Sequence, residues 1–208
     1  MNTKVDQIAD DIFRLSTYKP GLNGQDGVIF NLVLIDADEP LLYHCGQRWL
    51  FPLAIEAVAR IVDVKRLRWL SFSHMEADEC GSMNRWLAAA PNAMVAHGVV
   101  GCKLWVDDQA DRPPRRLHDD GVMDLGGKRV RFLATPHVPH NPDAGLRYEE
   151  TTETLFCSDL FAQMGDCPAF TEADVIGPAI VAEETFHLTS LTSQLAPTSR
   201  RLGEGNQR

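Results

Sequence analysis

The 208-residue sequence has little of what marks secreted, membrane or cysteine-ligated metal proteins. Its five cysteines are scattered and include no C-x-x-C pair, so they are weak candidates for metal ligands. No apolar stretch is long enough to cross a bilayer, and the polar first eleven residues contain three aspartates, which is not typical of a signal peptide. An odd number of unpatterned cysteines, together with an N-terminus that is not typical of a signal peptide, predicts reduced thiols and a cytoplasmic protein.

Positive charge is also scarce. The formal net charge is −9, whereas nucleic acids and anionic membrane surfaces are bound through basic patches. The sequence therefore predicts no nucleic-acid partner and no membrane partner. One small basic cluster, Arg112, Arg115 and Arg116 around two prolines, is expected to be a solvated turn or edge.

Strand and helix signals alternate along the first half of the chain. Apolar, β-rich runs predict strands at residues 28–35, 41–44, 67–73 and 93–96. Helical apolar spacing follows Pro52 and Ser82 and recurs at residues 99–106.

The second half is strand-rich before it turns helical near residue 171. Strands are expected at residues 122–125, 129–134, 146–149 and 154–157, the first two joined by a Gly-Gly hairpin turn. No repeat or linker interrupts the order, so we expect one layered α/β domain over residues 1–208.

The most informative segment is the H-x-E-x-D loop at residues 74–78, directly after an expected strand. In an extended loop, residues i and i+2 point to the same side and lie within about 7 Å. His74, Glu76 and Asp78 can therefore converge on one point, and a strand end is a rigid support for a metal site. The alternative for this motif alone is an acidic loop with one chance histidine.

Two further strand ends carry similar groups. His137 and His140 lie in a loop with three prolines, which stiffen a loop that must hold a ligand before a metal arrives. Asp159 follows an apolar strand, where a carboxylate is costly to bury unless it is paired or binds a metal. Its alternative role is a helix N-cap or an ion-pair partner. Three such strand ends together favour a metal centre over chance.

In combination, the H-x-E-x-D loop, the proline-rich loop with His140 and the S-D-L-F strand end resemble the metallo-β-lactamase superfamily. The likeness is to its flavodiiron and oxygen-binding di-iron branch. It implies an α/β fold, a metallo-β-lactamase-like αββα sandwich, here without the final C-terminal strand and helix. By position in these motifs, the resemblance implies a first iron held by His74, Glu76, His140 and Asp159, and a second metal held by Asp78 and bridged by Asp159. His137 would lie behind the ligands and orient one of them.

The donor set favours iron independently of the resemblance. Two histidines and three carboxylates form a hard, oxygen-rich site, which suits iron or manganese better than the histidine-rich sets of the zinc hydrolases of this fold. Glu76 stands where those hydrolases have a histidine. We therefore expect one or two irons per chain, with manganese or zinc as the alternatives.

The sequence departs from the family pattern at several positions. Glu79 stands where the family commonly has a histidine, and His44 where an aspartate is more usual. The one late histidine, His187, lies in a helical stretch and is a weak ligand candidate. The second metal is therefore expected to be weak or absent, with Glu79 as a candidate third donor. His97 is expected to be structural, and an uncovered sheet edge predicts a homo-oligomer.

The resemblance implies an oxidoreductase or binding protein for a diatomic gas, O₂ or NO, at non-haem iron. Flavodoxin-like, rubredoxin-like and flavin-binding motifs are missing from the sequence. Turnover then requires a separate electron-donor protein; without one, the chain would be an oxygen-responsive binding protein. Two alternatives stay open: a metal-dependent hydrolase of an ester, thioester or phosphodiester substrate, and a non-catalytic protein whose metal site has decayed.

Overall fold

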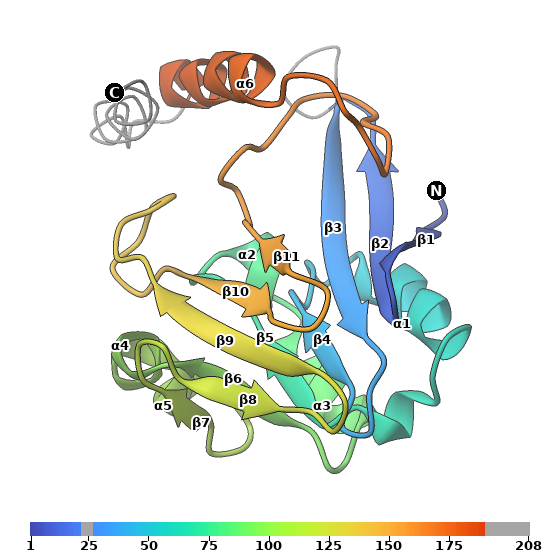
Figure 1. Cartoon of the computed structure of the whole chain (residues 1–208), viewed down its shortest axis with the longest axis vertical. Helices are drawn as coiled ribbons and strands as arrows, with labels where there is room; N and C mark the ends of the chain where they lie inside the picture. The colour runs from blue at the N-terminus through green and yellow to red at the C-terminus, as the bar shows by residue number, and fades with distance from the viewer. Residues whose placement is uncertain (22–26, 190–208) are drawn as a thin grey trace.

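Two β-sheets face each other in the computed structural model, which describes residues 1–21 and 27–189, the last seven by their backbone alone (Figure 1). The first sheet has seven strands in the order β1-β2-β3-β4-β5-β6-β7, and the second has four in the order β11-β10-β9-β8. The strands of the first sheet are β1 (Lys4–Ala9), β2 (Ile12–Lys19), β3 (Val28–Ile35), β4 (Leu41–Tyr43), β5 (Trp69–Ser71), β6 (Met94–Gly98) and β7 (Arg115–Leu117). Those of the second are β8 (Val122–Asp124), β9 (Arg129–Ala134), β10 (Gly145–Glu149) and β11 (Thr154–Phe156).

Short helices connect the strands. They are α1 (Phe51–Ala59), the 3₁₀ turn η1 (Val64–Arg66), α2 (Ala77–Cys80), α3 (Met83–Ala89), α4 (Val99–Gly101), the π-helical turn η2 (Cys102–Val106), α5 (Asp107–Gln109) and α6 (Ile176–Thr189). Pro52 lies in the first turn of α1, where its missing N–H leaves no helical bond unmade. Along the described part of the chain, no helix has both the length and the apolar character that a membrane crossing requires.

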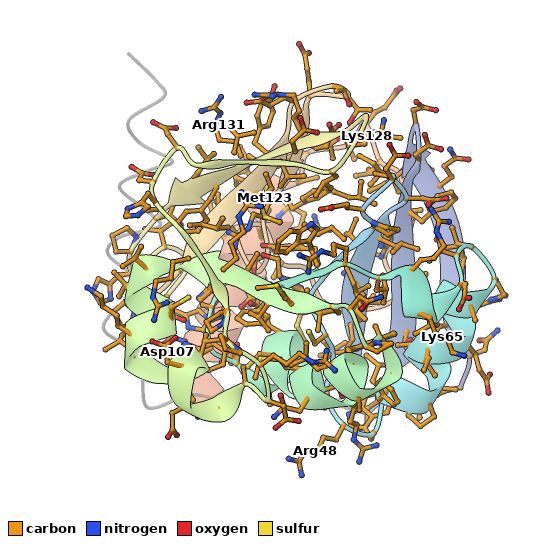
Figure 2. The ribbon with its side chains drawn as sticks, turned by 90° about the horizontal axis from the view of Figure 1, so that it is seen from below. Arg48, Lys65, Asp107, Met123, Lys128 and Arg131 are labelled. Carbon is orange, nitrogen blue, oxygen red and sulfur yellow. The ribbon has the colours of Figure 1, made fainter. Side chains whose placement is uncertain are left out.

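Two apolar cores separate the layers. One lies between the first sheet and the helices, and joins side chains such as Leu34 and Leu70 to Val58 of α1 and Trp86 of α3. The other lies between the two sheets and includes Met123, whose side chain points into the interior in Figure 2, while Arg48, Lys65 and Asp107 lie at the periphery. The arrangement is the α/β sandwich expected from the sequence.

The central strands bring the loops of the later site to one edge. β4 pairs in parallel with β5, and β5 with β6, so the segments that follow these strands leave the sheet on the same side. His44 follows β4, and His74 comes three residues after β5. The second sheet reaches the same place, because the Gly145 N–H at the start of β10 donates to the Ser73 carbonyl at 3.1 Å.

Most of the expected elements are confirmed, and the departures lie at the chain's start and in the H-x-E-x-D loop. β3 and β9 have the bounds that their apolar runs predict. Arg115 and Arg116 of the basic cluster lie in the edge strand β7, whereas Arg112 is half-buried and donates to three backbone carbonyls. Two strands that were not predicted, β1 and β2, precede β3. β1 is an edge strand with a largely polar sequence, which gives little periodic signal. The expected loss of the final strand and helix concerns residues 190–208, which lie outside the described residues.

Candidate metal centre

His74 reaches the centre from the loop after β5. Its ring is fully buried, and the Ser73 hydroxyl lies 2.8 Å from Nδ1. The backbone N–H of His74 donates to Glu79 Oε2 at 2.8 Å, which fixes the loop as well as the ring. Because Nδ1 is engaged with Ser73, Nε2 is the nitrogen that faces the other site residues.

Glu76 and Asp78 separate at the start of α2. Glu76 precedes the helix in extended backbone, with φ −143° and ψ 156°, and its Oε2 lies on the side of His74, 3.4 Å from Nε2. The expectation of an extended loop through Asp78 is wrong, since residues 77–80 form a helical turn in which successive residues rotate by about 100°. Asp78 therefore belongs to the first turn of α2 and not to an extended loop. Burial, and then the charges of Asp159 and Glu76, raise its pKa to about 6.

His140 comes from the proline-rich loop between β9 and β10. His137 and Asn141 both have a φ of 66°, and the His137 N–H donates to the Asn141 carbonyl at 2.8 Å. The Asn141 side chain donates to the Met75 carbonyl at 3.1 Å, which ties this loop to the His74 loop. The His140 and His74 rings are consequently 4.2 Å apart between centroids.

His137 does not lie behind the ligands as expected. Its side chain is exposed, and its positive φ belongs to the turn that brings His140 inward. Of the two loop histidines, the structure directs His140 toward the centre and His137 toward solvent.

Asp159 enters from the end of β11. Ser158, with a φ of 53°, turns the chain so that Asp159 Oδ2 lies 3.2 Å from His140 Nε2 and 3.4 Å from His74 Nε2. Glu76 Oε2 lies 3.4 Å from His74 Nε2 and 3.6 Å from His140 Nε2.

Four donor atoms thus gather from three strand ends. One atom each of His74, Glu76, His140 and Asp159 lies within 4.8 Å of all the others. These are the four residues that the sequence motifs assign to the first iron, and Asp78 lies outside this group.

The charges of the four groups depend on one another. Burial lowers the pKa of His74, but Asp159 and Glu76 outweigh this effect and raise the pKa to about 10. Burial raises the pKa of Asp159, but the neighbouring imidazoles of His140 and His74 outweigh it and hold the pKa well below its usual range. Positive charge on the imidazoles therefore balances the carboxylates, and a divalent cation among the same atoms would replace those protons.

His74 Nε2 tests whether these residues fit a metal. The atom is buried and has no hydrogen-bond partner among the described residues, with its two nearest carboxylate oxygens at 3.4 Å. Buried polar atoms nearly always have a partner, and a metal ion would provide one. Two imidazoles and two carboxylates are also a normal donor set for a divalent transition metal. The four donor residues therefore fit a divalent metal ion.

Comparison with known proteins identifies the family. The model described as ODP family beta lactamase matches residues 29–199. The chain belongs to this family. The resemblance that the three motifs suggest, to the metallo-β-lactamase superfamily and its flavodiiron branch, is thereby confirmed.

Individual relatives of this ODP-family chain are larger proteins. It is 29% identical over 140 residues to diflavin flavoprotein A 1 of Synechocystis sp., a match that covers 66% of this chain and 24% of the relative. It therefore spans about a quarter of that relative's length.

Two solved structures show the same fold. The Flv1 flavodiiron core from Synechocystis sp. PCC6803 has a TM-score of 0.78 at 22% identity, over 98% of this chain and 53% of that one. Rubredoxin oxygen:oxidoreductase from Desulfovibrio gigas has a TM-score of 0.76 at 16% identity, over 88% and 48%.

The two positions at which the resemblance implies departures from the family pattern, His44 and Glu79, are neighbours in space in this ODP-family chain. His44 Nε2 lies 3.3 Å from Glu79 Oε1, and burial lowers the pKa of His44 to about 4. Glu79 also accepts hydrogen bonds from Ser73, His74 and Ser158, and its role as a third donor for a second metal stays a prediction.

His97 of the ODP-family chain does not belong to the four-donor group. His97 is structural, as expected: it is fully buried, and its Nε2 lies 3.2 Å from Asp143 Oδ2. Sequence reasoning missed Asp143. His187 belongs to α6, but its side chain lies outside the described residues.

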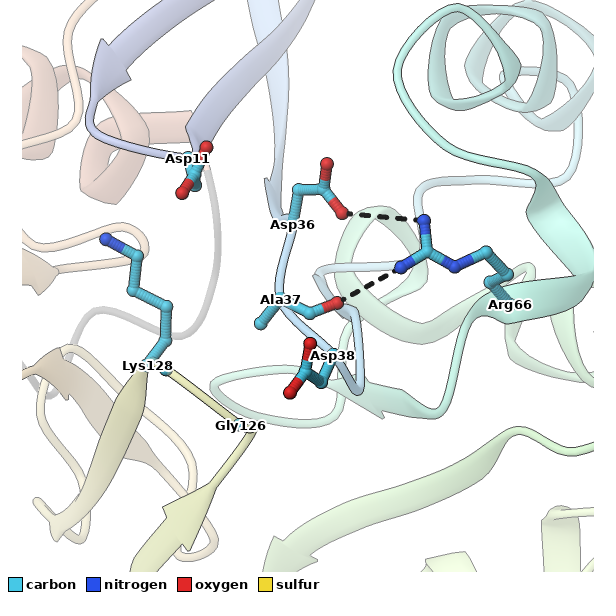
Figure 3. A pocket seen from close by; sticks show the side chains of 8 residues that line it. Asp11, Asp36, Ala37, Asp38, Arg66, Gly126 and Lys128 are labelled. Carbon is cyan, nitrogen blue, oxygen red and sulfur yellow. Dashed lines mark hydrogen bonds and ion pairs between the residues drawn. The ribbon is translucent and has the colours of Figure 1, made fainter.

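A pocket at the opposite end of β4 is separate from this centre (Figure 3). It is lined by Asp11, Asp36, Ala37, Asp38, Arg66, Gly126, Gly127 and Lys128. Arg66 lies 4.0 Å from Asp36 Oδ1 and donates to the Ala37 carbonyl at 3.4 Å. The lining contains neither histidine nor cysteine, so its chemistry differs from that of the metal centre.

Proposed function

We propose that this chain binds iron through His74, Glu76, His140 and Asp159 and acts on a diatomic gas, O₂ or NO, as an oxidoreductase of the flavodiiron type. The observation that carries the proposal is the mixed donor set, two imidazoles and two carboxylates with donor atoms within 4.8 Å of one another. The names of the relatives, a diflavin flavoprotein and a flavodiiron core, point to the same chemistry.

The four donor residues would have different roles in binding the metal. His74 and His140 would bind through Nε2, since Ser73 engages the Nδ1 of His74. Glu76 and Asp159 would offset the charge of a divalent ion. Their side chains are 47% and 35% exposed, so a small solute reaches the centre from solvent. Iron, when bound, would supply the electron-transfer chemistry that gas binding and reduction require.

Electrons would come from outside these residues. No flavin-binding loop and no C-x-x-C motif occurs in the 208 residues, and we propose a separate electron-donor protein as the partner. The cytoplasmic location and the homo-oligomer stay predictions, the second of which light scattering after gel filtration tests.

Anaerobic reconstitution tests the proposed function. The apoprotein is loaded with Fe(II) without oxygen, its metal content is measured, and absorption spectra are recorded before and after O₂ or NO is added. We expect retained iron and a spectral change with at least one gas. Zinc-dependent hydrolysis of an ester or thioester, together with an iron form that reacts with neither gas, would instead establish the hydrolase alternative.

A further inference from the structure

Glu79 is a buried carboxylate at the point where the loops of the metal centre meet. It belongs to α2 and is 1% exposed. Its contacts come from three other segments: the residues before α2, the end of β4, and the end of β11. A buried carboxylate needs such partners, because its charge is costly to remove from water.

Protein donors take up both oxygens of Glu79. Oε2 accepts the backbone N–H groups of Ser73 and His74 at 3.0 and 2.8 Å. Oε1 accepts the hydroxyl of Ser158 and lies 3.3 Å from His44 Nε2. A carboxylate has about four acceptor positions, and three hydrogen bonds fill most of them, two on Oε2 and one on Oε1.

The segments that Glu79 joins are those that carry two of the four donors. His74 is bonded to it directly, and Ser158 is the residue before Asp159. These hydrogen bonds belong to a buried network, where the low dielectric strengthens each of them. Glu79 therefore fixes the distance between the His74 loop and the Asp159 loop.

We propose that Glu79 is a positioning residue, and not a ligand: it locks the His74 and Asp159 loops together so that the four donors stand ready for the metal. This inference rests on the proposed metal centre. It assigns a role to a position at which the chain departs from its family, and it predicts that metal affinity depends on a residue that does not touch the metal.

Cobalt(II) binding tests the inference without any gas reaction. Wild-type protein and the Glu79→Gln variant are titrated with Co(II), with a competing chelator, while the visible bands of the bound ion are recorded. Glutamine keeps the shape of the side chain but replaces one acceptor oxygen with an NH₂ group. We expect Glu79→Gln to bind Co(II) about ten- to a hundredfold more weakly, with shifted bands and an unchanged number of ions per chain.

Two further variants sharpen the comparison. Ser158→Ala removes one hydrogen bond to Glu79 and should weaken binding several-fold in the same direction. Glu56→Gln, at an exposed position of α1, is the matched control and should leave affinity and bands unchanged. If circular dichroism shows that Glu79→Gln does not fold, Ser158→Ala decides the question.

The outcomes separate this inference from the proposed function. Wild-type affinity and bands in Glu79→Gln, or in Ser158→Ala where that variant decides, would overturn the positioning role. The loss of one bound ion per chain in Glu79→Gln would show that Glu79 is a ligand and would overturn it too. A wild-type protein that binds neither Co(II) nor Fe(II) would contradict the proposed metal centre itself.

Discussion

The indole N–H of Trp105 donates to Asp143 Oδ2 at 2.8 Å, and this bond fastens the loop that carries His140 to the helical layer. The same oxygen lies 3.2 Å from His97 Nε2. Burial raises the pKa of Asp143, but the hydrogen bonds from His97 and Trp105 outweigh it and hold the pKa below its usual range. Asp143 thus anchors the third ligand loop from behind.

Replacing Asp143 should cost both stability and metal affinity. In Asp143→Ala the buried N–H groups of His97 and Trp105 lose their acceptor, and an unsatisfied buried donor costs about 1–3 kcal/mol. We expect a loss of that size in urea unfolding and weaker metal binding, because the His140 loop is released. Asp143→Asn, which keeps an acceptor oxygen, should lose less. Asp108→Ala, at an exposed site, is the control; equal stability of Asp143→Ala and wild type would contradict the anchoring role.

The proline-rich loop offers a matched pair of histidines for the ligand assignment. His140→Ala removes a donor of the four-residue group, and we expect iron to be lost on gel filtration while the circular dichroism spectrum is kept. His137→Ala changes an exposed residue of the same loop and should retain iron. Metal analysis of both proteins distinguishes them, and full iron in His140→Ala would refute the assignment.

The strand ends could be predicted from the sequence because their signals are local. The apolar run of β3 and the H-x-E-x-D spacing of His74 and Glu76 depend only on neighbours in the chain. The roles of Glu79 and Asp143 could not be predicted in this way. Their partners, such as Ser158 and Trp105, lie 79 and 38 residues away, and only the folded chain brings them together. The helical turn at Asp78 was not predicted for another reason, since the sequence shows no break between the extended loop and α2.

Acid should weaken the fold through Glu149, at the turn between β10 and β11. Burial raises its pKa, but hydrogen bonds from Thr151 and Thr152 outweigh this and lower the pKa to about 2. An unfolded glutamate has a pKa of about 4.3. The pKa in the folded state is the lower one. The stability that Glu149 contributes is therefore complete above about pH 4.3 and is lost as the pH falls toward 2.

The double variant Thr151→Val/Thr152→Val tests this pH dependence. It removes both hydroxyl donors of Glu149, each at 2.6 Å, and should lower the free energy of unfolding by about 1–3 kcal/mol at pH 7. The difference from wild type should shrink as the pH falls from about 4.3 to 2, because wild-type Glu149 then becomes protonated. Urea unfolding across this range measures it. The Thr151→Ser/Thr152→Ser variant keeps both hydroxyls and should follow wild type; a difference that stays constant with pH would mean that Glu149 is not the group involved.

Arg147 joins the two sheets from within, and its replacement should loosen the base of the metal centre. The guanidinium is fully buried, lies 4.4 Å from the centre of the Phe132 ring, and donates to the Ser71 hydroxyl at 3.1 Å and the Phe72 carbonyl at 3.2 Å. These two acceptors are at the end of β5, just before the His74 loop, whereas Arg147 belongs to β10.

Arg147→Met fills a similar volume but cannot donate to β5, so we expect a loss of about 2–4 kcal/mol in urea unfolding and weaker Co(II) binding. Arg147→Lys should be only partly better, since a single ammonium cannot reproduce the planar set of donors that spans both sheets. Arg48→Met, at an exposed position labelled in Figure 2, is the matched control and should change neither measurement. If Arg147→Met is as stable as wild type but binds Co(II) more weakly, Arg147 affects the centre through its charge and not through the joint between the sheets. If both measurements match wild type, the connection that Arg147 makes between the sheets does not support the metal centre.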